Sequence, residues 1–172
     1  AVDLGRAQKC QLGKLAYHAD DQLIAQAWEW AARNGGGAEA LTPARAYFDN
    51  LLANRRTNSL EFVPTQPGGG YSLCTERWCW CDALFMAPPT MLRIGAATGD
   101  KRYAEFVHSE WKATTDYLYD PSEDLYFRDS RFFDQRDAKG RKGFWSRGNG
   151  WVMGGLVRVL QTLGADDPQR PY

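Results

Sequence analysis

The sequence predicts an all-α fold in which two concentric layers of helices form an α/α toroid. Some helical segments are apolar on every side, as inner helices are, whereas others carry a single apolar stripe and suit an outer layer. The connecting segments are of uneven length, and no short repeat of a solenoid type recurs along the chain. The 172 residues, 44% of them hydrophobic, can bury a substantial core, so we expect a single domain over residues 1–172.

The first helix is expected over residues 20–33, where apolar residues recur at spacings of three and four. The glycines at 35–37 should end it. Thr42 is expected to cap the next helix, with Pro43 at its first position. The apolar stripe of that helix comprises Ala44, Tyr47, Phe48, Leu51 and Leu52. Residues 54–71 contain several prolines and glycines, and they are predicted to form a loop.

The densest apolar run lies between residues 80 and 97 and predicts a helix that is buried on every side. Pro88 and Pro89 lack an amide hydrogen, so the regular part of this helix should begin near Ala87. Gly99 should end it.

Asp100 is expected to cap an amphipathic helix. The apolar face of that helix comprises Tyr103, Phe106, Val107, Trp111, Thr114, Tyr117 and Leu118. A short β-hairpin is predicted near residues 125–145, where aromatic residues alternate imperfectly before a polar turn. A second inner helix is expected over residues 150–163, with small residues that let a neighbouring helix come close.

Composition excludes several classes of partner. The chain has 21 basic and 21 acidic residues, so no overall field attracts nucleic acid. No stretch approaches the roughly 18 apolar residues of a membrane-spanning helix, so we expect no membrane partner. The first residues lack the apolar core of a signal peptide, which favours a cytoplasmic location and leaves the periplasm as the alternative.

The four cysteines are not expected to form a disulfide framework. Cys74, Cys79 and Cys81 fall within eight positions, in a chain too large to depend on disulfides for its core. We expect them and Cys10 to be reduced, partly buried thiols in a reducing compartment. Their spacing also lacks the C-x2-C pattern of a zinc site, so no metal is expected.

Asp82 is a candidate general acid in a motif that concentrates aromatic residues, WCWCDALFM at 78–86. A carboxyl at the head of a buried helix, beside Trp80, loses hydration, and this favours the protonated form that a general acid needs. Capping of the helix by Asp82 is the alternative interpretation.

A second motif of this kind is FWSRGNGW at 144–151. Trp145 and Trp151 bracket Arg147, and indoles beside a guanidinium suit a site that stacks on a pyranose ring and holds a carboxylate. The alternative is that the tryptophans are core residues and that Arg147 forms a structural ion pair.

Asp20 and Asp21 follow His18 at the start of the first predicted helix. Paired acids at this position most often interact with the helix dipole. The other interpretation is that one of them is the second carboxylate of a glycosidase pair.

These motifs, in this order and spacing, closely resemble the unsaturated glucuronyl and rhamnogalacturonyl hydrolases of glycoside hydrolase families 88 and 105, especially family 105. The resemblance runs from about His18 to Leu163 and includes DYLYDPSEDLYFRDSRFF at 116–133. It implies an (α/α)6 barrel, of which this chain holds the central part without the N- and C-terminal helices. A partial barrel would expose apolar inner helices, so we expect the chain to associate with further copies of itself as a homo-oligomer.

The resemblance also implies an activity. Family members remove a 4,5-unsaturated uronic acid from the non-reducing end of lyase-generated oligosaccharides, by hydration of the enol ether double bond and without a cofactor. The alternative for this chain is a non-catalytic, sugar-binding module.

The roles of individual residues follow from the same resemblance. Asp82 matches the general acid and base, and a second acid falls on Asp21 or Asp20. Many members carry a histidine at the position of Arg128, so the resemblance leaves the substrate preference open. The expected sugar-binding residues are Trp80, Met86, Trp145, Arg147, Trp151, His18 and Arg128.

Overall fold

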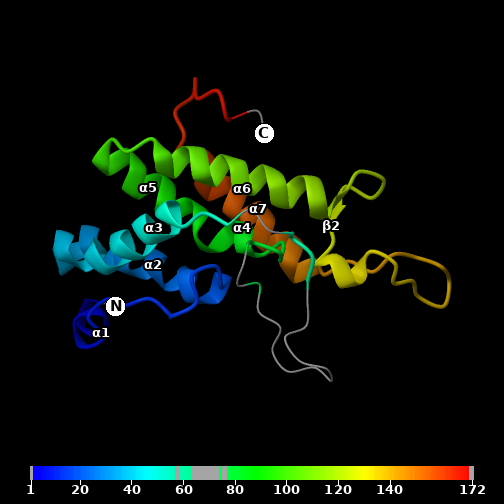
Figure 1. Ribbon diagram of the computed structural model, residues 1–172, viewed down its shortest axis with the longest axis horizontal. Helices are drawn as coiled ribbons and strands as arrows, with labels where there is room; N and C mark the ends of the chain where they lie inside the picture. Colours follow the sequence, from blue (N-terminus) through cyan, green and yellow to red (C-terminus); the bar gives the residue numbers. More distant parts are fainter. Residues whose placement is uncertain (1, 57–58, 63–73, 75–76, 171–172) are drawn as a thin grey trace.

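The computed structural model describes residues 2–56, 59–62, 74 and 77–170 (Figure 1). Its regular structure is mostly helical, which confirms the predicted all-α class. The helices are α1 (Val2–Ala7), α2 (Ala19–Ala31), α3 (Thr42–Ala53), α4 (Ala83–Met86), α5 (Pro88–Thr98), α6 (Arg102–Leu118) and α7 (Ser146–Leu160). Short helical turns also occur at η1 (Ala32–Gly36), η2 (Ala38–Leu41) and η3 (Ser130–Phe132).

The first two long helices lie where the apolar spacing predicts them. The chain leaves α2 through η1, and Gly35 and Gly37 adopt φ angles of +88° and +82°, which favour glycine. The expected cap at Thr42 is wrong: its side chain makes no capping hydrogen bond. The reason is that η2 runs directly into α3, so that the Thr42 N–H bonds the carbonyl of Glu39. The predicted loop at 54–71 lies largely outside the described residues.

The long apolar run folds as two helices, α4 and α5, that meet at the two prolines. Since Pro88 and Pro89 cannot donate to carbonyls four residues back, the helical hydrogen bonding breaks there, as predicted. Most of the residues from Cys81 to Gly95 are buried, as the prediction for residues 80–97 requires, but Ala96 and Ala97 in the last turn of α5 are exposed. Gly99 ends α5 in the left-handed conformation, with φ +72°.

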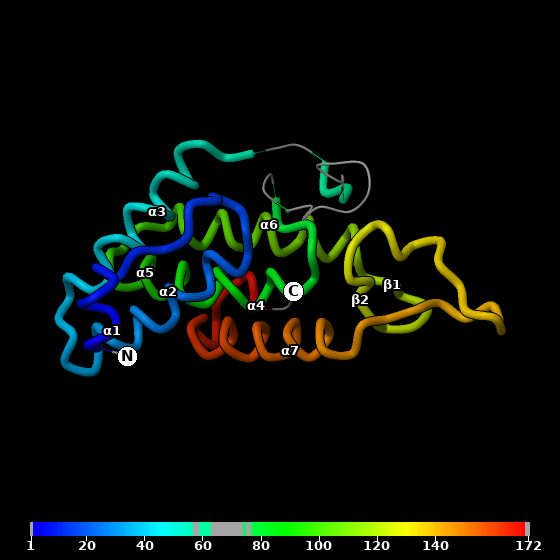
Figure 2. The backbone as a smooth tube through the Cα atoms, turned by 90° about the horizontal axis from the view of Figure 1, so that it is seen from below, coloured from blue at the N-terminus to red at the C-terminus, as the bar shows by residue number. Residues whose placement is uncertain are grey.

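The amphipathic helix α6 also follows the prediction. Its apolar face packs into the main core, and the Asp100 carboxylate accepts a hydrogen bond from the Arg102 N–H at 3.1 Å near its start. Figure 2 shows α6 running alongside α5.

The β-hairpin begins earlier in the chain than predicted. β1 (Tyr119–Asp120) pairs with β2 (Leu125–Tyr126) in antiparallel register directly after α6. Asp124, with φ +55°, closes the turn. Within the predicted span 125–145, the pairing seen among the described residues beyond β2 is one isolated bridge, between Arg136 and Lys142.

Helix α7 starts at Ser146, before the predicted span, and it is buried on one face only. Gly155 lies so close to α4 that an added Cβ would meet the Leu84 carbonyl oxygen at 2.4 Å, so the small residue does allow the predicted close approach. The expectation that this helix is covered on every side is wrong, because α4 and α5 cover one face and the other is open: Met153 is 69% exposed and Val157 is 54% exposed.

Two cysteines depart from the expectation of reduced thiols. Cys74 and Cys79 form a disulfide, with their Cα atoms 5.4 Å apart, whereas Cys10 and Cys81 are free and buried. The sulfurs meet because both cysteines lie in one small cluster with Leu60 and Phe62. Cys79, one of the two bonded cysteines, directly precedes Trp80 in the chain.

Candidate active site

The two aromatic motifs lie against each other in the structure. Asp82 is at the N-terminal end of α4, and Trp145 precedes the first turn of α7. At Gly148 an added Cβ would lie 2.3 Å from the Trp145 ring and 2.9 Å from Cys81 Sγ. Glycine at this position therefore lets the start of α7 pack directly on the segment that carries Asp82.

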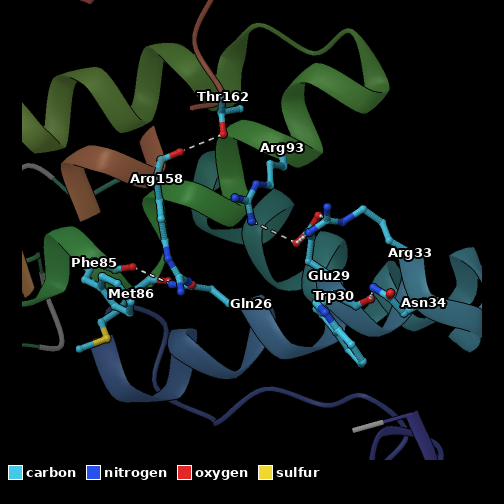
Figure 3. Close-up of polar contacts among 10 residues, drawn as sticks. All are labelled: Gln26, Glu29, Trp30, Arg33, Asn34, Phe85, Met86, Arg93, Arg158 and Thr162. Carbon is cyan, nitrogen blue, oxygen red and sulfur yellow. Dashed lines mark hydrogen bonds and ion pairs between the residues drawn. The ribbon is translucent and has the colours of Figure 1, made fainter. Parts of the chain in front are cut away.

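A buried glutamine holds α4 in place. The Gln26 amide on α2 donates hydrogen bonds to the carbonyls of Phe85 at 2.7 Å and Met86 at 2.8 Å (Figure 3). Its oxygen accepts a hydrogen bond from Arg158 of α7, whose guanidinium lies over the Phe85 ring at 4.7 Å. These contacts link α2, α4 and α7.

Gln26 is a structural residue of the site that the sequence interpretation missed. It falls between the predicted apolar positions of α2, and a polar residue buried there needs hydrogen-bond partners. Asn149 of the second aromatic motif also has a structural role, since its side chain accepts from the Tyr126 N–H at 2.8 Å and donates to the Tyr126 carbonyl at 3.0 Å. Asn149 thereby joins the hairpin to α7.

Asp82 has the environment of a proton-transfer residue. It is 8% exposed, makes no capping hydrogen bond, and its Oδ1 has no hydrogen-bond partner among the described residues. Burial raises the pKa of Asp82 to about 6, the negative charge of Asp20 adds to this effect, and the positive charge of Arg128 opposes it. A carboxyl with this pKa can give and take a proton near neutral pH.

The two neighbouring acids of α2 have different surroundings. The Asp21 carboxylate accepts hydrogen bonds from the Leu15 N–H at 3.0 Å and from His18 Nδ1 at 3.1 Å. Asp20 is exposed and lines a cleft, and its charge acts on Asp82. The structure thus brings Asp20 to Asp82 and engages Asp21 in contacts with the segment before α2.

Tryptophan rings and arginine side chains form a connected cluster, and one of its members, Arg128, acts on Asp82 through its charge. The Arg128 guanidinium lies over the rings of both Trp80, at 5.7 Å, and Trp145, at 5.5 Å. Arg147 lies over Trp145 at 4.7 Å. The His18 ring meets Trp80 edge-on at 6.1 Å, and Trp80 Nε1 is buried without a partner among the described residues.

The last two predicted sugar-binding residues differ in their exposure. Trp151 packs against Phe85 at 4.7 Å and, with Asp20, lines a cleft of about 810 Å³ that continues between α2 and α7. Met86 is 4% exposed and belongs to the main core. Ring contacts therefore connect five of the predicted residues beside Asp82, namely His18, Trp80, Arg128, Trp145 and Arg147. Trp151 lies in the cleft, Met86 lies in the core, and Asp21 contacts His18.

In the described part of the chain, no group of three or more His, Cys, Asp or Glu side chains is arranged to hold a metal ion. The same residues include no helix that is long and apolar enough to cross a membrane.

Comparisons with known proteins identify relatives of this chain. The chain is 39% identical over 158 residues to an unsaturated 3S-rhamnoglycuronyl hydrolase of Alteromonas sp. (strain LOR), covering 90% of this chain and 38% of that protein. A solved glycosyl hydrolase family 88 structure from Bacteroides vulgatus superposes with a TM-score of 0.73 and 25% identity, over 94% of this chain and 43% of that one. A structure described as a polysaccharide lyase superposes with a TM-score of 0.76 and 22% identity, over 99% and 49% of the two chains, which shows the shared fold.

The chain thus spans less than half the length of these relatives. The helical toroid predicted from the sequence is confirmed, and only part of it is present. The family model of Glycosyl Hydrolase Family 88 matches residues 5–172, almost the whole sequence, and the chain therefore belongs to that family.

Proposed function

We propose that this chain carries the catalytic acid of a glycoside hydrolase that removes a 4,5-unsaturated uronic acid from the non-reducing end of lyase-generated oligosaccharides. The observation that carries the proposal is the Asp82 carboxyl, which is buried, has an unpartnered Oδ1 and has a pKa raised to about 6. Such a group is protonated often enough near neutral pH to act as an acid and can then act as a base. Membership of family 88 and the name of the Alteromonas relative support this substrate class.

The proposed reaction is hydration of the enol ether. Asp82 donates its proton to C4 of the unsaturated sugar, and positive charge develops at C5. The Asp82 carboxylate then takes a proton from a water molecule as the water oxygen bonds to C5, which restores the acid. The resulting hemiketal opens and releases the remaining sugar.

Asp20 is the better candidate for the second acid. Its negative charge disfavours ionisation of Asp82, so it helps to keep the proton on Asp82 until the substrate is bound. Asp21 acts indirectly in this proposal, because its contacts with Leu15 and His18 fix the segment before α2.

Aromatic and basic side chains orient the sugar. Arg147 holds the carboxylate on C5 through two parallel hydrogen bonds, and Trp145 and Trp151 provide stacking surfaces for the ring. Met86 supports the site through packing, since it lies in the core.

A spectroscopic assay tests the proposed activity. Hydration destroys the conjugated double bond of the unsaturated uronic acid, so turnover appears as loss of its ultraviolet absorbance. We expect this loss with the parent chain and its absence with Asp82→Asn, because an amide cannot deliver the proton. Binding of the oligosaccharide without loss of absorbance would instead support a non-catalytic, sugar-binding module.

We also propose that the 172-residue chain self-associates through α7. Met153 and Val157 are exposed on one face of this helix, and burying a few hundred Å² of apolar surface contributes several kcal/mol at about 25 cal/mol per Å². Light scattering at micromolar concentration should report the mass of a dimer or larger assembly. Replacing both Met153 and Val157 by lysine should lower the measured mass of the assembly. A monodisperse monomer of 19.4 kDa for the parent would contradict this proposal.

A further inference from the structure

Two guanidinium groups in the site lie on the same tryptophan. Arg147 and Arg128 are both over the Trp145 ring, at 4.7 and 5.5 Å from its centre, and Arg128 is also over Trp80 at 5.7 Å. Stacking on an indole engages the flat face of a guanidinium and leaves its N–H groups, which lie in the plane, able to bind an acceptor.

Within the described residues, neither guanidinium donates a hydrogen bond. The neighbouring carboxylate of Asp129 is occupied by Arg131, which donates from Nε and from a terminal nitrogen, each at 2.8 Å. Arg128 approaches Asp129 only through Nε at 3.7 Å, and its side chain is 39% exposed. By contrast, Arg158 and Arg93, which line the cleft that contains Trp151, do donate to protein acceptors.

Two guanidinium groups that donate no hydrogen bond within the described residues provide more donors than one carboxylate requires. A carboxylate accepts two parallel hydrogen bonds from one guanidinium, and Arg147 suffices for the carboxylate of the uronic acid. Arg128 also has a fixed position relative to Asp82, because its carbonyl accepts a hydrogen bond from the Cys81 N–H at 3.0 Å. Its guanidinium lies over the rings of both Trp80 and Trp145, which are two candidate stacking surfaces for sugar rings.

We infer that Arg128 is a specificity-determining residue that binds a second anionic group of the substrate, carried by the sugar attached to the unsaturated uronic acid. This inference rests on the proposed function. Both a carboxylate and a sulfate ester present the oxygen pair that a guanidinium recognises, so an oxyanion on the second sugar is the chemistry in question.

Three disaccharides test the inference. All carry the same unsaturated uronic acid, and the second sugar is neutral, sulfated or carboxylated. The kcat/KM of the parent should be at least about tenfold higher for one of the charged substrates than for the neutral one, since a charge-assisted hydrogen bond contributes about 1.5–3 kcal/mol. The preferred charged substrate identifies the oxyanion.

Variants of Arg128 separate recognition from folding. Arg128→Gln should remove the preference, because it should raise KM for the charged substrate at least about tenfold more than it raises KM for the neutral substrate. Arg128→Lys should retain part of the preference, because it keeps the charge and loses the planar fork. Arg136→Gln is the matched control, since Arg136 lies on the same segment and donates to the backbone carbonyls of Phe133 and Gln135.

The failures of the two proposals can be told apart. Absence of turnover with all three disaccharides contradicts the proposed function, and calorimetric Kd values for the same sugars then decide the inference. Equal losses on neutral and charged substrates in Arg128→Gln, or a parent chain without any preference, would overturn the role of Arg128. Thermal unfolding of each variant shows whether a loss reflects misfolding.

Discussion

Replacing Asp82 by asparagine should stabilise the protein while it removes turnover. The pKa of Asp82 is raised from 3.8 to about 6, mainly because burial disfavours the ionised form. In the unfolded chain Asp82 loses its proton around its ordinary pKa, whereas in the folded protein it does so only near pH 6. Folding therefore carries a penalty above pH 6 that corresponds to about 3 kcal/mol.

The sign of this effect sets the pH dependence. Below about pH 4 Asp82 is largely protonated in both the folded and the unfolded chain, so the penalty is nearly absent. It grows as pH rises through the interval between the two pKa values. Asparagine does not ionise, so Asp82→Asn does not carry this penalty. The difference in the free energy of unfolding between Asp82→Asn and the parent should therefore grow by about 3 kcal/mol from acid to neutral pH, in favour of the variant.

Urea denaturation, followed by tryptophan fluorescence at a series of pH values, measures this difference. Asp116→Asn is a suitable control, because Asp116 is exposed on α6 and pairs with Lys112 at the surface, so the change should stay within about 0.5 kcal/mol. A difference between Asp82→Asn and the parent that is the same at acid and neutral pH would refute the reasoning. So would turnover by Asp82→Asn within tenfold of the parent.

The remaining predictions concern substrate binding and helix packing. Arg147→Lys should raise KM about tenfold in the absorbance assay, because an ammonium cannot form the paired hydrogen bonds of a guanidinium; an unchanged KM would show that Arg147 is structural. Gly155→Ala should lower the free energy of unfolding in the urea titration by about 1–3 kcal/mol, since the added Cβ would meet the Leu84 carbonyl. Gly150→Ala on the same helix is the control: nothing lies within 4 Å of its added Cβ, so this change should be neutral or slightly stabilising. Gln26→Leu should cost about 1–3 kcal/mol because the two carbonyls at the end of α4 lose their donor, and a cost near zero would show that water replaces it.

Local signals in the sequence were sufficient for much of the helical framework. The apolar spacing of α2, α3 and α6 and the pair Pro88–Pro89 acted over a few residues, so the structure reproduces them. Asp82 could be identified as a buried acid for the same reason, because it lies next to the long apolar run that became α4 and α5. The aromatic motifs likewise identified the residues that surround it.

Tertiary structure decided which of these residues meet. Adjacent residues on a helix point about 100° apart, so only the packing of α2 against α4 shows that Asp20 rather than Asp21 acts on Asp82. The open face of α7 also depends on segments far apart in the sequence, since α4 and α5 cover its other face. Periodicity reports what a helix can bury, whereas its neighbours determine what it does bury, and those neighbours are set by the fold as a whole.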